Sequence, residues 1–405
     1  MTSFSNESLQ NITIEEGGVE VDNNNTVFNN WDDEHLNINT NLLRGIYAIG
    51  FENPSPIQTK AIIPLIQGKD IIAQAQSGTG KTGAFSIGSL QLVDENIKQP
   101  QIIMLSPTRE LAKQTTNVLV QLSTCMNIYT HLFVGGTSID EDIRILENNT
   151  PQIIVGCPGR IHDMMRRNYL KTKHIKLIIL DEADEMLSIG FKEQVYNIFQ
   201  KLNNNVQVGL FSATMPDELN TLTNKFMREP VQILVKSEML TLEGITQYYV
   251  AVDDDAVKYA TLKDIFEIIS VSQSIIYCNS VKRVEELYQA MISDSFPVCT
   301  LNSSMEKEDR ERSYNEFKSG KYRVLISTNV TARGIDIQQV STVINFDIPK
   351  DVHTYLHRIG RSGRWGRKGV GINFVTKNDI QKMKYIEQYY NTQIEEMPSN
   401  FQDKY

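Results

Sequence analysis

The chain has 405 residues, 40% hydrophobic and 22% charged, a composition typical of a globular protein with two domains of ordinary size. It contains no apolar run of about 18 residues and no basic-then-apolar leader, so we expect neither a membrane-spanning helix nor a secretory signal. Most of the net charge of −9 comes from residues 1–35, which hold eight acids and no Lys or Arg. The nearly neutral remainder neither supports nor excludes binding to nucleic acid.

Residues 1–30 are rich in Asn, Ser and Glu and poor in large apolar side chains, which predicts a disordered tail. The cysteines form no C-x-x-C pair and stand at Cys125, Cys157, Cys278 and Cys299. We therefore expect reduced thiols in a cytoplasmic protein, without a disulfide framework or a zinc cage.

Short apolar runs then alternate with longer amphipathic stretches, which predicts parallel sheets covered by helices on both faces. In residues 31–236 the predicted strands are 71–75, 101–106, 131–135, 153–156, 177–180, 206–211 and 231–235. A mixed-charge linker is predicted at 237–244. In residues 245–405 the predicted strands are 245–252, 274–278, 298–301, 323–326, 343–346 and 371–375. The expected fold class is α/β, with two similar domains in tandem, and ligands gather beyond the C-terminal strand ends of such sheets.

A glycine-rich segment follows the first of these strands. Its candidate nucleotide-binding residues are Ser77, Gly78, Thr79, Gly80, Lys81 and Thr82. Glycines let backbone N–H groups turn inward around phosphates at a helix N-terminus. Lys81 would reach the outer phosphates and the Thr82 hydroxyl would bind Mg²⁺. The alternative is an ordinary glycine-rich turn.

Acidic residues follow the strand at 177–180 directly, in the order Asp181, Glu182, Ala183 and Asp184. Adjacent carboxylates repel, and a divalent cation resolves that conflict. Asp181 would hold Mg²⁺ through water, and Glu182 would orient or deprotonate an attacking water. A solvated acidic helix start is the alternative. Together with the phosphate loop, the acids predict a nucleoside triphosphatase.

These two motifs, with Ser212-Ala213-Thr214 and the segment 357–364, resemble the DEAD-box RNA helicases in order and in spacing. The resemblance spans about residues 31–400 and implies two RecA-like domains that use ATP and Mg²⁺ and bind RNA. It also implies that Ser212, Ala213, Thr214, His357 and Arg358 couple the two activities. The segment 50–58 resembles the adenine-recognition motif of the family, with Phe51 and Gln58 as its functional residues. Trp31 is the candidate for stacking on the base.

The resemblance places further residues in the second domain. It implies that Arg361 and Arg364 reach the γ-phosphate as arginine fingers and that Asp336 binds the ribose hydroxyls. Hydrolysis would then require closure of the two domains around the nucleotide, which RNA promotes by binding to both.

The RNA-binding residues implied by the resemblance follow strand ends in both domains. They are Pro107, Thr108, Arg109, Gly135, Gly136, Pro158, Gly159, Arg160, Asn279, Arg310 and Thr328. Such groups contact the phosphate backbone, so we expect little sequence preference. The chain departs from the usual family residues at Cys157, 301–304, Lys307 and Asn329, all in the second domain or in segments of the RNA side.

Segments 42–47, 226–228, 240–244 and 390–398 resemble the family branch that acts in translation initiation. The resemblance implies unwinding of messenger-RNA leaders by a monomer that a scaffold protein of the cap-binding initiation complex activates. Three alternatives stay open: an RNA clamp of the exon-junction type, an ATP-binding scaffold with weakened RNA coupling, and a DNA translocase.

Overall fold

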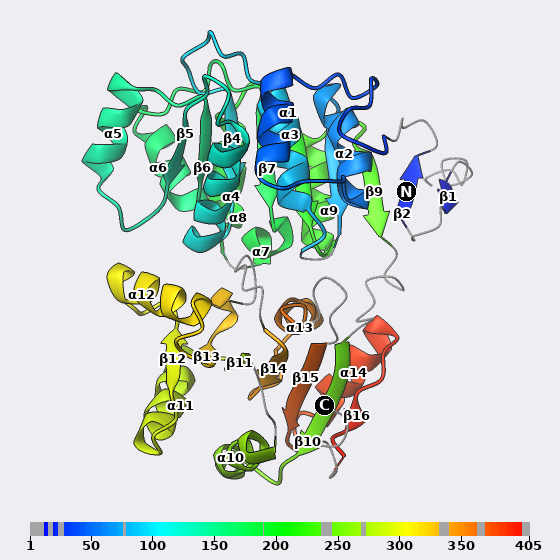
Figure 1. Ribbon diagram of the computed structural model, residues 1–405, viewed down its shortest axis with the longest axis vertical. Coiled ribbons are helices and arrows are strands. Elements are labelled where there is room, and N and C mark those ends of the chain that lie inside the picture. Colours follow the sequence, from blue (N-terminus) through cyan, green and yellow to red (C-terminus); the bar gives the residue numbers. More distant parts are fainter. Residues whose placement is uncertain are drawn as a thin grey trace. The chain divides into compact units, whose positions relative to one another are not determined.

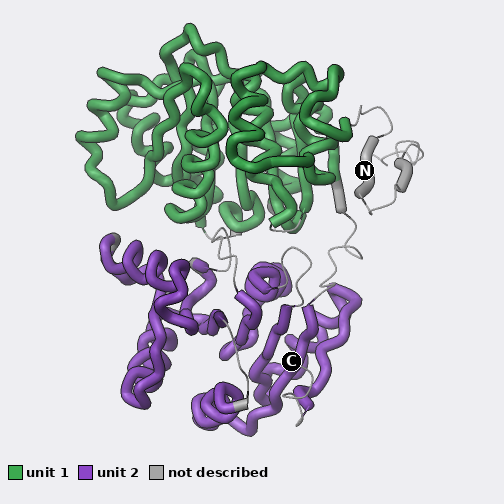
Figure 2. The backbone as a smooth tube through the Cα atoms, viewed as in Figure 1, with its two compact units in different colours: residues 1–239 green, residues 240–405 purple. Residues whose placement is uncertain are grey.

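The computed structural model describes residues 12–14, 19–22, 28–75, 78–188, 190–235, 245–268, 273–331, 340–362 and 369–398. The chain divides into two compact units, residues 1–239 and 240–405 (Figure 2). The division falls inside the predicted linker at 237–244.

Unit 1 is built on a mainly parallel sheet (Figure 1). Its parallel strands are β3 (Ile71–Gln74), β4 (Ile102–Leu105), β5 (Thr130–Phe133), β6 (Ile153–Gly156), β7 (Leu177–Asp181), β8 (Gln207–Ser212) and β9 (Val231–Val235), in the spatial order β9-β3-β8-β7-β4-β6-β5. Each strand coincides with one of the predicted apolar runs. The runs are nearly continuous because both faces of the sheet are buried.

Alternate residues of these strands enter two cores, one on each face. Ile71 and Ile102 pack with helices α1 (Thr40–Ala48), α2 (Pro56–Ile66), α3 (Lys81–Leu92) and α4 (Arg109–Leu122). Ile72 and Ile103 pack on the other face with α5 (Ile139–Asn148), α6 (Pro158–Arg166), α7 (Ala183–Ser188), α8 (Lys192–Gln200) and α9 (Asp217–Phe226). The predicted covering of both faces is confirmed.

Unit 2 repeats the design with parallel pairing between all neighbouring strands. Its strands are β10 (Ile245–Ala251), β11 (Ser274–Tyr277), β12 (Val298–Leu301), β13 (Val324–Ser327), β14 (Thr342–Asn345), β15 (Gly369–Val375) and β16 (Glu395–Glu396), in the order β12-β13-β11-β14-β15-β10-β16. Helices α10 (Lys258–Ile268) and α11 (Val281–Ser293) pack on one face, and α12 (Lys307–Lys318), α13 (Val352–Ile359) and α14 (Ile380–Tyr390) on the other.

The tail differs from the expected disorder in two short segments. Strand β1 (Ile12–Ile14) pairs antiparallel with β2 (Val19–Asp22), and β2 pairs antiparallel with β9. The alternation of Val19 and Val21 with acids suits a strand, and the edge of β9 offers unpaired backbone groups. The two-residue strand β16 was also not predicted, since it is too short to show periodicity. Across the described residues, no helix has the length and apolarity needed to span a bilayer.

Candidate nucleotide and RNA sites

The strand order of unit 1 divides the C-terminal edge of its sheet into two halves. Neighbouring strands β3, β8 and β7 end in the glycine-rich loop, in Ser212–Thr214 and in the acidic motif. Neighbouring strands β4, β6 and β5 end in the segments 107–109, 158–160 and 135–136. The residues predicted for nucleotide therefore lie together, beside those predicted for RNA.

The glycine-rich loop leads into the N-terminus of α3. Gly80, the N-cap residue, has a φ of +102°, and a Cβ there would lie 2.6 Å from Ser55 Oγ. Only glycine fits this position. The Lys81 ammonium donates to Ala75 O at 2.9 Å, so it lies over the loop that would hold the phosphates. Ser77 lies outside the described residues.

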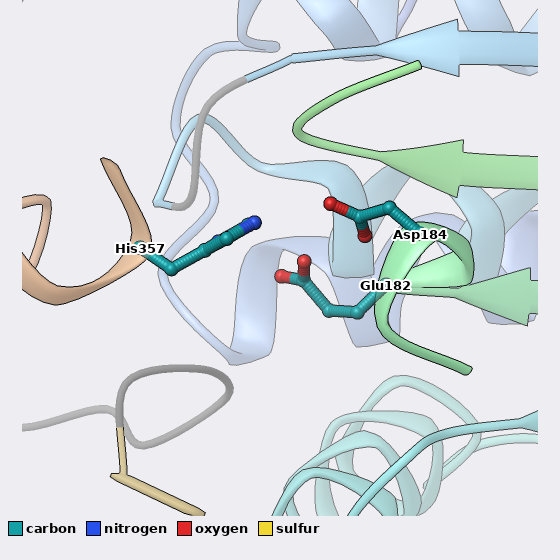
Figure 3. Close-up of side chains that lie close together, drawn as sticks. All are labelled: Glu182, Asp184 and His357. Atoms are coloured by element: carbon teal, nitrogen blue, oxygen red, sulfur yellow. The ribbon is translucent and has the colours of Figure 1, made fainter. Parts of the chain in front are cut away.

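The acidic motif is buried at the end of β7. Asp181, Glu182 and Asp184 are each 3% exposed, and Glu182 has a φ of +52°, a strained conformation for a residue with a side chain. Glu182 and Asp184 project from the same turn (Figure 3). Burial, together with the neighbouring Glu182, raises the pKa of Asp181 to about 7.

Burial of adjacent carboxylates costs free energy that a bound cation recovers. The donor set therefore fits Mg²⁺, with Asp181 and Thr82 as the residues that would hold it. Lys81 lies 3.8 Å from Glu182, so unit 1 itself places a cation beside these acids.

The Gln58 side chain is more engaged than the sequence predicted. Its Oε1 accepts from Ser55 N at 2.7 Å, and its Nε2 donates to Gly80 O at 3.2 Å. One N–H and one lone pair of the amide are left for an adenine. Phe51 lies beside it, since a Cβ on Gly83 would come within 3.0 Å of the Phe51 ring and 2.5 Å of Gln58 Nε2.

Trp31 does not present an open ring face for base stacking. It is 1% exposed within the core of unit 1, with its ring centroid 5.8 Å from that of Phe28. The described geometry therefore favours Phe51 over Trp31 as the aromatic beside the base.

The predicted coupling segment 212–214 joins the loop to the acids. Ala75 N donates to Ser212 O, and Gln74 Nε2 donates to Ala213 O. Thr214 Oγ1 donates to Asp184 Oδ2 at 2.5 Å, and Asp184 N donates to Ser212 Oγ at 3.4 Å. A displacement of the segment 212–214 would thus change the hydrogen bonds of both the glycine-rich loop and the acidic motif.

On the RNA half of the edge, Arg109 lies over the glycine pair. A Cβ on Gly136, whose φ is +82°, would come within 2.7 Å of its guanidinium, so this position needs glycine, whereas a Cβ on Gly135 would lie at an ordinary contact distance of 3.5 Å. Thr108 caps α4 by accepting from Leu111 N. Pro107 is buried, and Pro158 and Gly159 form the first turn of α6 with Gly159 exposed. Backbone N–H groups at that turn suit a phosphate.

Arg160 was expected to contact RNA, but its guanidinium is used inside the protein. It forms an ion pair with Asp142, and it donates to Thr137 Oγ1 at 3.1 Å and Thr137 O at 2.8 Å. Its side chain is 7% exposed. Arg160 therefore anchors the turn that follows Gly135 and Gly136.

In unit 2, Asn279, which follows β11, and Arg358 of α13 bond to each other. Arg358 Nη2 donates to Asn279 Oδ1 at 2.8 Å, and Asn279 Nδ2 donates to Ile348 O at 2.8 Å. Arg358 is fully buried, and this burial lowers its pKa to about 10, so it stays charged at neutral pH. Asn279 is thus largely occupied by contacts within the protein and not fully available to RNA.

The remaining predicted residues of unit 2 are placed as follows. Thr328 follows β13, Arg310 lies on α12, and both are partly buried. His357 lies in the last turn of α13 and Arg361 just beyond it, each nearly fully buried. Asp336 and Arg364 lie outside the described residues.

Two residues that position the sites were not predicted. Gly83 keeps α3 close to Phe51 and Gln58, and a glycine inside a helix is a signal that could have shown this, because it is costly there. Asp142 anchors Arg160 from 18 positions away. Nothing in the sequence marks Asp142 among the other acids of α5.

Two RecA-like domains, with a phosphate loop and buried acids in the first, define the class of nucleotide-hydrolysing helicases. Residues 55–222 match the DEAD/DEAH box helicase family, and residues 257–366 match the helicase conserved C-terminal domain. The chain belongs to this family and is a DEAD-box ATP-dependent RNA helicase, an RNA-stimulated ATPase.

Relatives match over almost their full length. The chain is 52% identical to the ATP-dependent RNA helicase eIF4A of Pyricularia oryzae over 96% of this chain and 98% of that protein. It is also 52% identical to eIF4A of Neurospora crassa, over 96% and 97%. Among solved structures, S. cerevisiae Dbp5 bound to RNA and ADP BeF3 is similar with a TM-score of 0.85 and 36% identity, over 92% of this chain and 96% of that one. Mss116p bound to ssRNA and AMP-PNP has a TM-score of 0.81 and 25% identity, over 90% and 78%.

Proposed function

We propose that this helicase unwinds structured messenger-RNA leaders during translation initiation, and that it hydrolyses ATP with Mg²⁺ as the cofactor. The observation that carries the proposal is the shared strand edge of unit 1. There the loop of Lys81, the acids at 181–184 and the segment 212–214 form one hydrogen-bonded group, beside the strand ends predicted for RNA. The near full-length similarity to eIF4A proteins supports the biological role.

Each residue of the nucleotide half has a proposed task. The backbone N–H groups of the loop and the Lys81 ammonium bind the phosphates, and Gln58 with Phe51 selects adenine. Thr82 and Asp181 hold the metal, which neutralises charge on the phosphates when bound. Glu182 orients the attacking water and accepts its proton. Its fixed, buried position supports that role, since the carboxylate needs little rearrangement.

Unit 2 contributes the residues that complete hydrolysis in this proposal. Arg361 and Arg364 stabilise the charge that develops on the γ-phosphate, and Asp336 binds the ribose. Arg361 directly follows α13, whose buried Arg358 is bonded to Asn279, a predicted RNA contact. RNA binding and arginine placement would then depend on the same buried group.

The proposed partners are single-stranded or locally opened mRNA and a scaffold protein of the cap-binding complex. The protein would act in the cytoplasm, as a monomer outside that complex. Contacts to the RNA backbone alone predict little preference for sequence. Cys157 stands where the family usually has Thr, so one hydroxyl that could bind the RNA backbone is missing, and we expect weak RNA binding without the scaffold.

The decisive test measures ATP hydrolysis alone, with single-stranded RNA and with single-stranded DNA, followed by strand separation of a short RNA duplex. Stimulation by RNA only, with unwinding that requires ATP, is the expected result. Equal stimulation by DNA would indicate a translocase of another kind. Stable retention of RNA without turnover would indicate a clamp. Capture of a cap-complex scaffold by the wild-type protein then tests the biological role.

A further inference from the structure

A continuous chain of buried polar side chains crosses the sheet of unit 2. It starts at Arg358 on α13 and runs through Asn345 on β14 and Asn373 on β15. It then passes through Tyr355 of α13 to Gln247 on β10, and ends at Thr392 beyond α14. The first five side chains are at most 4% exposed. Buried polar groups are costly unless all are bonded, so a chain of this length in a core calls for a reason.

The bonds of the chain all run in one direction. Arg358 Nη1 donates to Asn345 Oδ1 at 3.1 Å, and Asn345 Nδ2 donates to Asn373 Oδ1 at 2.8 Å. Asn373 Nδ2 donates to the Tyr355 hydroxyl at 3.2 Å, which donates to Gln247 Oε1 at 2.8 Å. Gln247 Nε2 donates to Thr392 Oγ1 at 2.8 Å. Each group accepts from one neighbour and donates to the next, an arrangement in which bonds strengthen one another.

The series of hydrogen bonds begins at Arg358, whose guanidinium is fully hydrogen-bonded. The five N–H groups of Arg358 are all donated, to Asn279, Asn329, Asn345 and Asp347 O. All of these acceptors are neutral oxygens. Asn329 replaces the Asp that is frequent in the family, so none of these five bonds of the guanidinium goes to a carboxylate. Its orientation therefore depends more heavily on the amides and on what holds them.

We propose that Asn345, Asn373, Tyr355 and Gln247 are positioning residues for RNA binding. Through their hydrogen bonds they orient Arg358, which in turn holds Asn279 and the Thr328-Asn329 turn in place. The inference rests on the proposed function, because the role of Asn279 and Thr328 in RNA binding is part of it. Strand register supports it: Asn345 and Asn373 are direct neighbours in the parallel pair β14–β15, so the chain is built into the sheet. Burial also raises the pKa of Tyr355, which keeps the hydroxyl able to donate.

Tyr355→Phe removes the central hydroxyl, and Tyr390→Phe is its matched control. Tyr390 of α14 is also buried, at 4% exposed, and its hydroxyl donates to Val352 O of α13, which is not a member of this series of hydrogen bonds. We expect Tyr355→Phe to raise the RNA concentration for half-maximal ATPase stimulation by roughly tenfold, because the two hydrogen bonds of the hydroxyl are lost and each is worth about a few-fold. The turnover at saturating RNA and the affinity for a fluorescent ATP analogue should change less than twofold. Tyr390→Phe should leave all three values unchanged.

Two further variants keep the test decisive if Tyr355→Phe lowers the yield of folded protein. Thr392→Val, at the partly exposed tail of the chain, should raise the half-saturating RNA concentration about two- to threefold. Asn329→Asp gives Arg358 a carboxylate, and charge-assisted bonds are roughly twice as strong. Added to Tyr355→Phe, it should restore most of the RNA affinity, which a merely structural role of Tyr355 would not predict.

The outcomes separate the inference from the proposed function. If wild-type ATPase does not respond to RNA, the proposed function fails and the inference with it. If the wild type responds, but Tyr355→Phe matches Tyr390→Phe in RNA dependence, the inference alone is overturned. The same holds if Asn329→Asp fails to rescue.

Discussion

The ammonium of Lys81 lies 3.8 Å from a carboxylate oxygen of Glu182, and the two side chains are 5% and 4% exposed. Lys81 begins α3 after the loop that follows β3, and Glu182 directly follows β7; β8 lies between β3 and β7 in the sheet. A cation and a carboxylate that face each other in a buried site can divide phosphate binding and water activation between them, with the carboxylate as the general base.

Lys81→Ala should weaken binding of a fluorescent ATP analogue by about a hundredfold, since a charged hydrogen-bond donor to phosphate is lost. Titration by fluorescence measures it. Lys69→Ala is the matched control: its side chain is exposed, ahead of the same strand. Unchanged affinity in Lys81→Ala would show that the loop is misassigned.

Glu182→Gln should keep ATP affinity within a few-fold while hydrolysis slows by about 10²–10⁴, the usual contribution of a general base. Single-turnover hydrolysis with RNA present measures it, and the complex with ATP and RNA should persist. Glu193→Gln, on the exposed face of α8, should behave as wild type. Normal turnover in Glu182→Gln would exclude the carboxylate as the base.

Arg361→Ala should spare nucleotide binding and lower RNA-stimulated turnover by about 10³–10⁵, as for the loss of an arginine finger. Paired measurements of analogue affinity and ATPase rate test this expectation. The control is Arg312→Ala, whose side chain is 66% exposed on α12. Hydrolysis that continues at the wild-type rate would contradict the contribution of unit 2.

Arg160→Ala should cost about 3 kcal/mol of unfolding free energy, because the buried carboxylate of Asp142 then keeps only the His131 ring, at 3.7 Å, as an ion-pair partner. Replacing both partners, as Arg160→Met with Asp142→Leu, should recover much of that stability. It should not recover RNA-stimulated ATPase, because both bonds from Arg160 to Thr137 stay lost. Urea unfolding and ATPase assays separate the two effects. Arg166→Ala, on an exposed ion pair, should stay within about 0.5 kcal/mol. Full RNA response in the double variant would remove Arg160 from the RNA site.

The cysteines offer a native chemical probe of the RNA half. Burial raises the pKa of Cys278 and Cys299 to about 12, so both should resist alkylation until the protein unfolds. Cys125 is exposed, and Cys157, ahead of Pro158, is partly exposed. RNA with an ATP analogue should slow alkylation of Cys157 and leave Cys125 unaffected, as mass spectrometry of the labelled peptides would show. Equal labelling of Cys157 with and without RNA would place the RNA elsewhere.

Sequence patterns were sufficient for the buried strands of both sheets, but not for the short strands β1, β2 and β16, and they placed the candidate site residues at strand ends. Continuous apolar runs such as 177–180 mark buried parallel strands, and the polar residues that follow them must lie at one edge. Patterns could not assign partners to long side chains. Whether Arg160 or Arg358 faces RNA or the protein interior depends on residues such as Asp142 and Asn345, which only the folded chain brings near. Gln58 shows the same limit, because its bond to Gly80 O joins elements 22 residues apart.

That bond has a consequence for efforts to change which nucleobase the enzyme accepts. The amide of Gln58 both faces the proposed base position and supports the turn at Gly80. A substitution that changes the base selectivity will therefore also change the affinity for the triphosphate. A carboxylate at this position would lack the donor to Gly80 O, and such a variant would bind every nucleoside triphosphate more weakly, whatever its base. A switch to guanine would first need a second residue to take over the support of the turn.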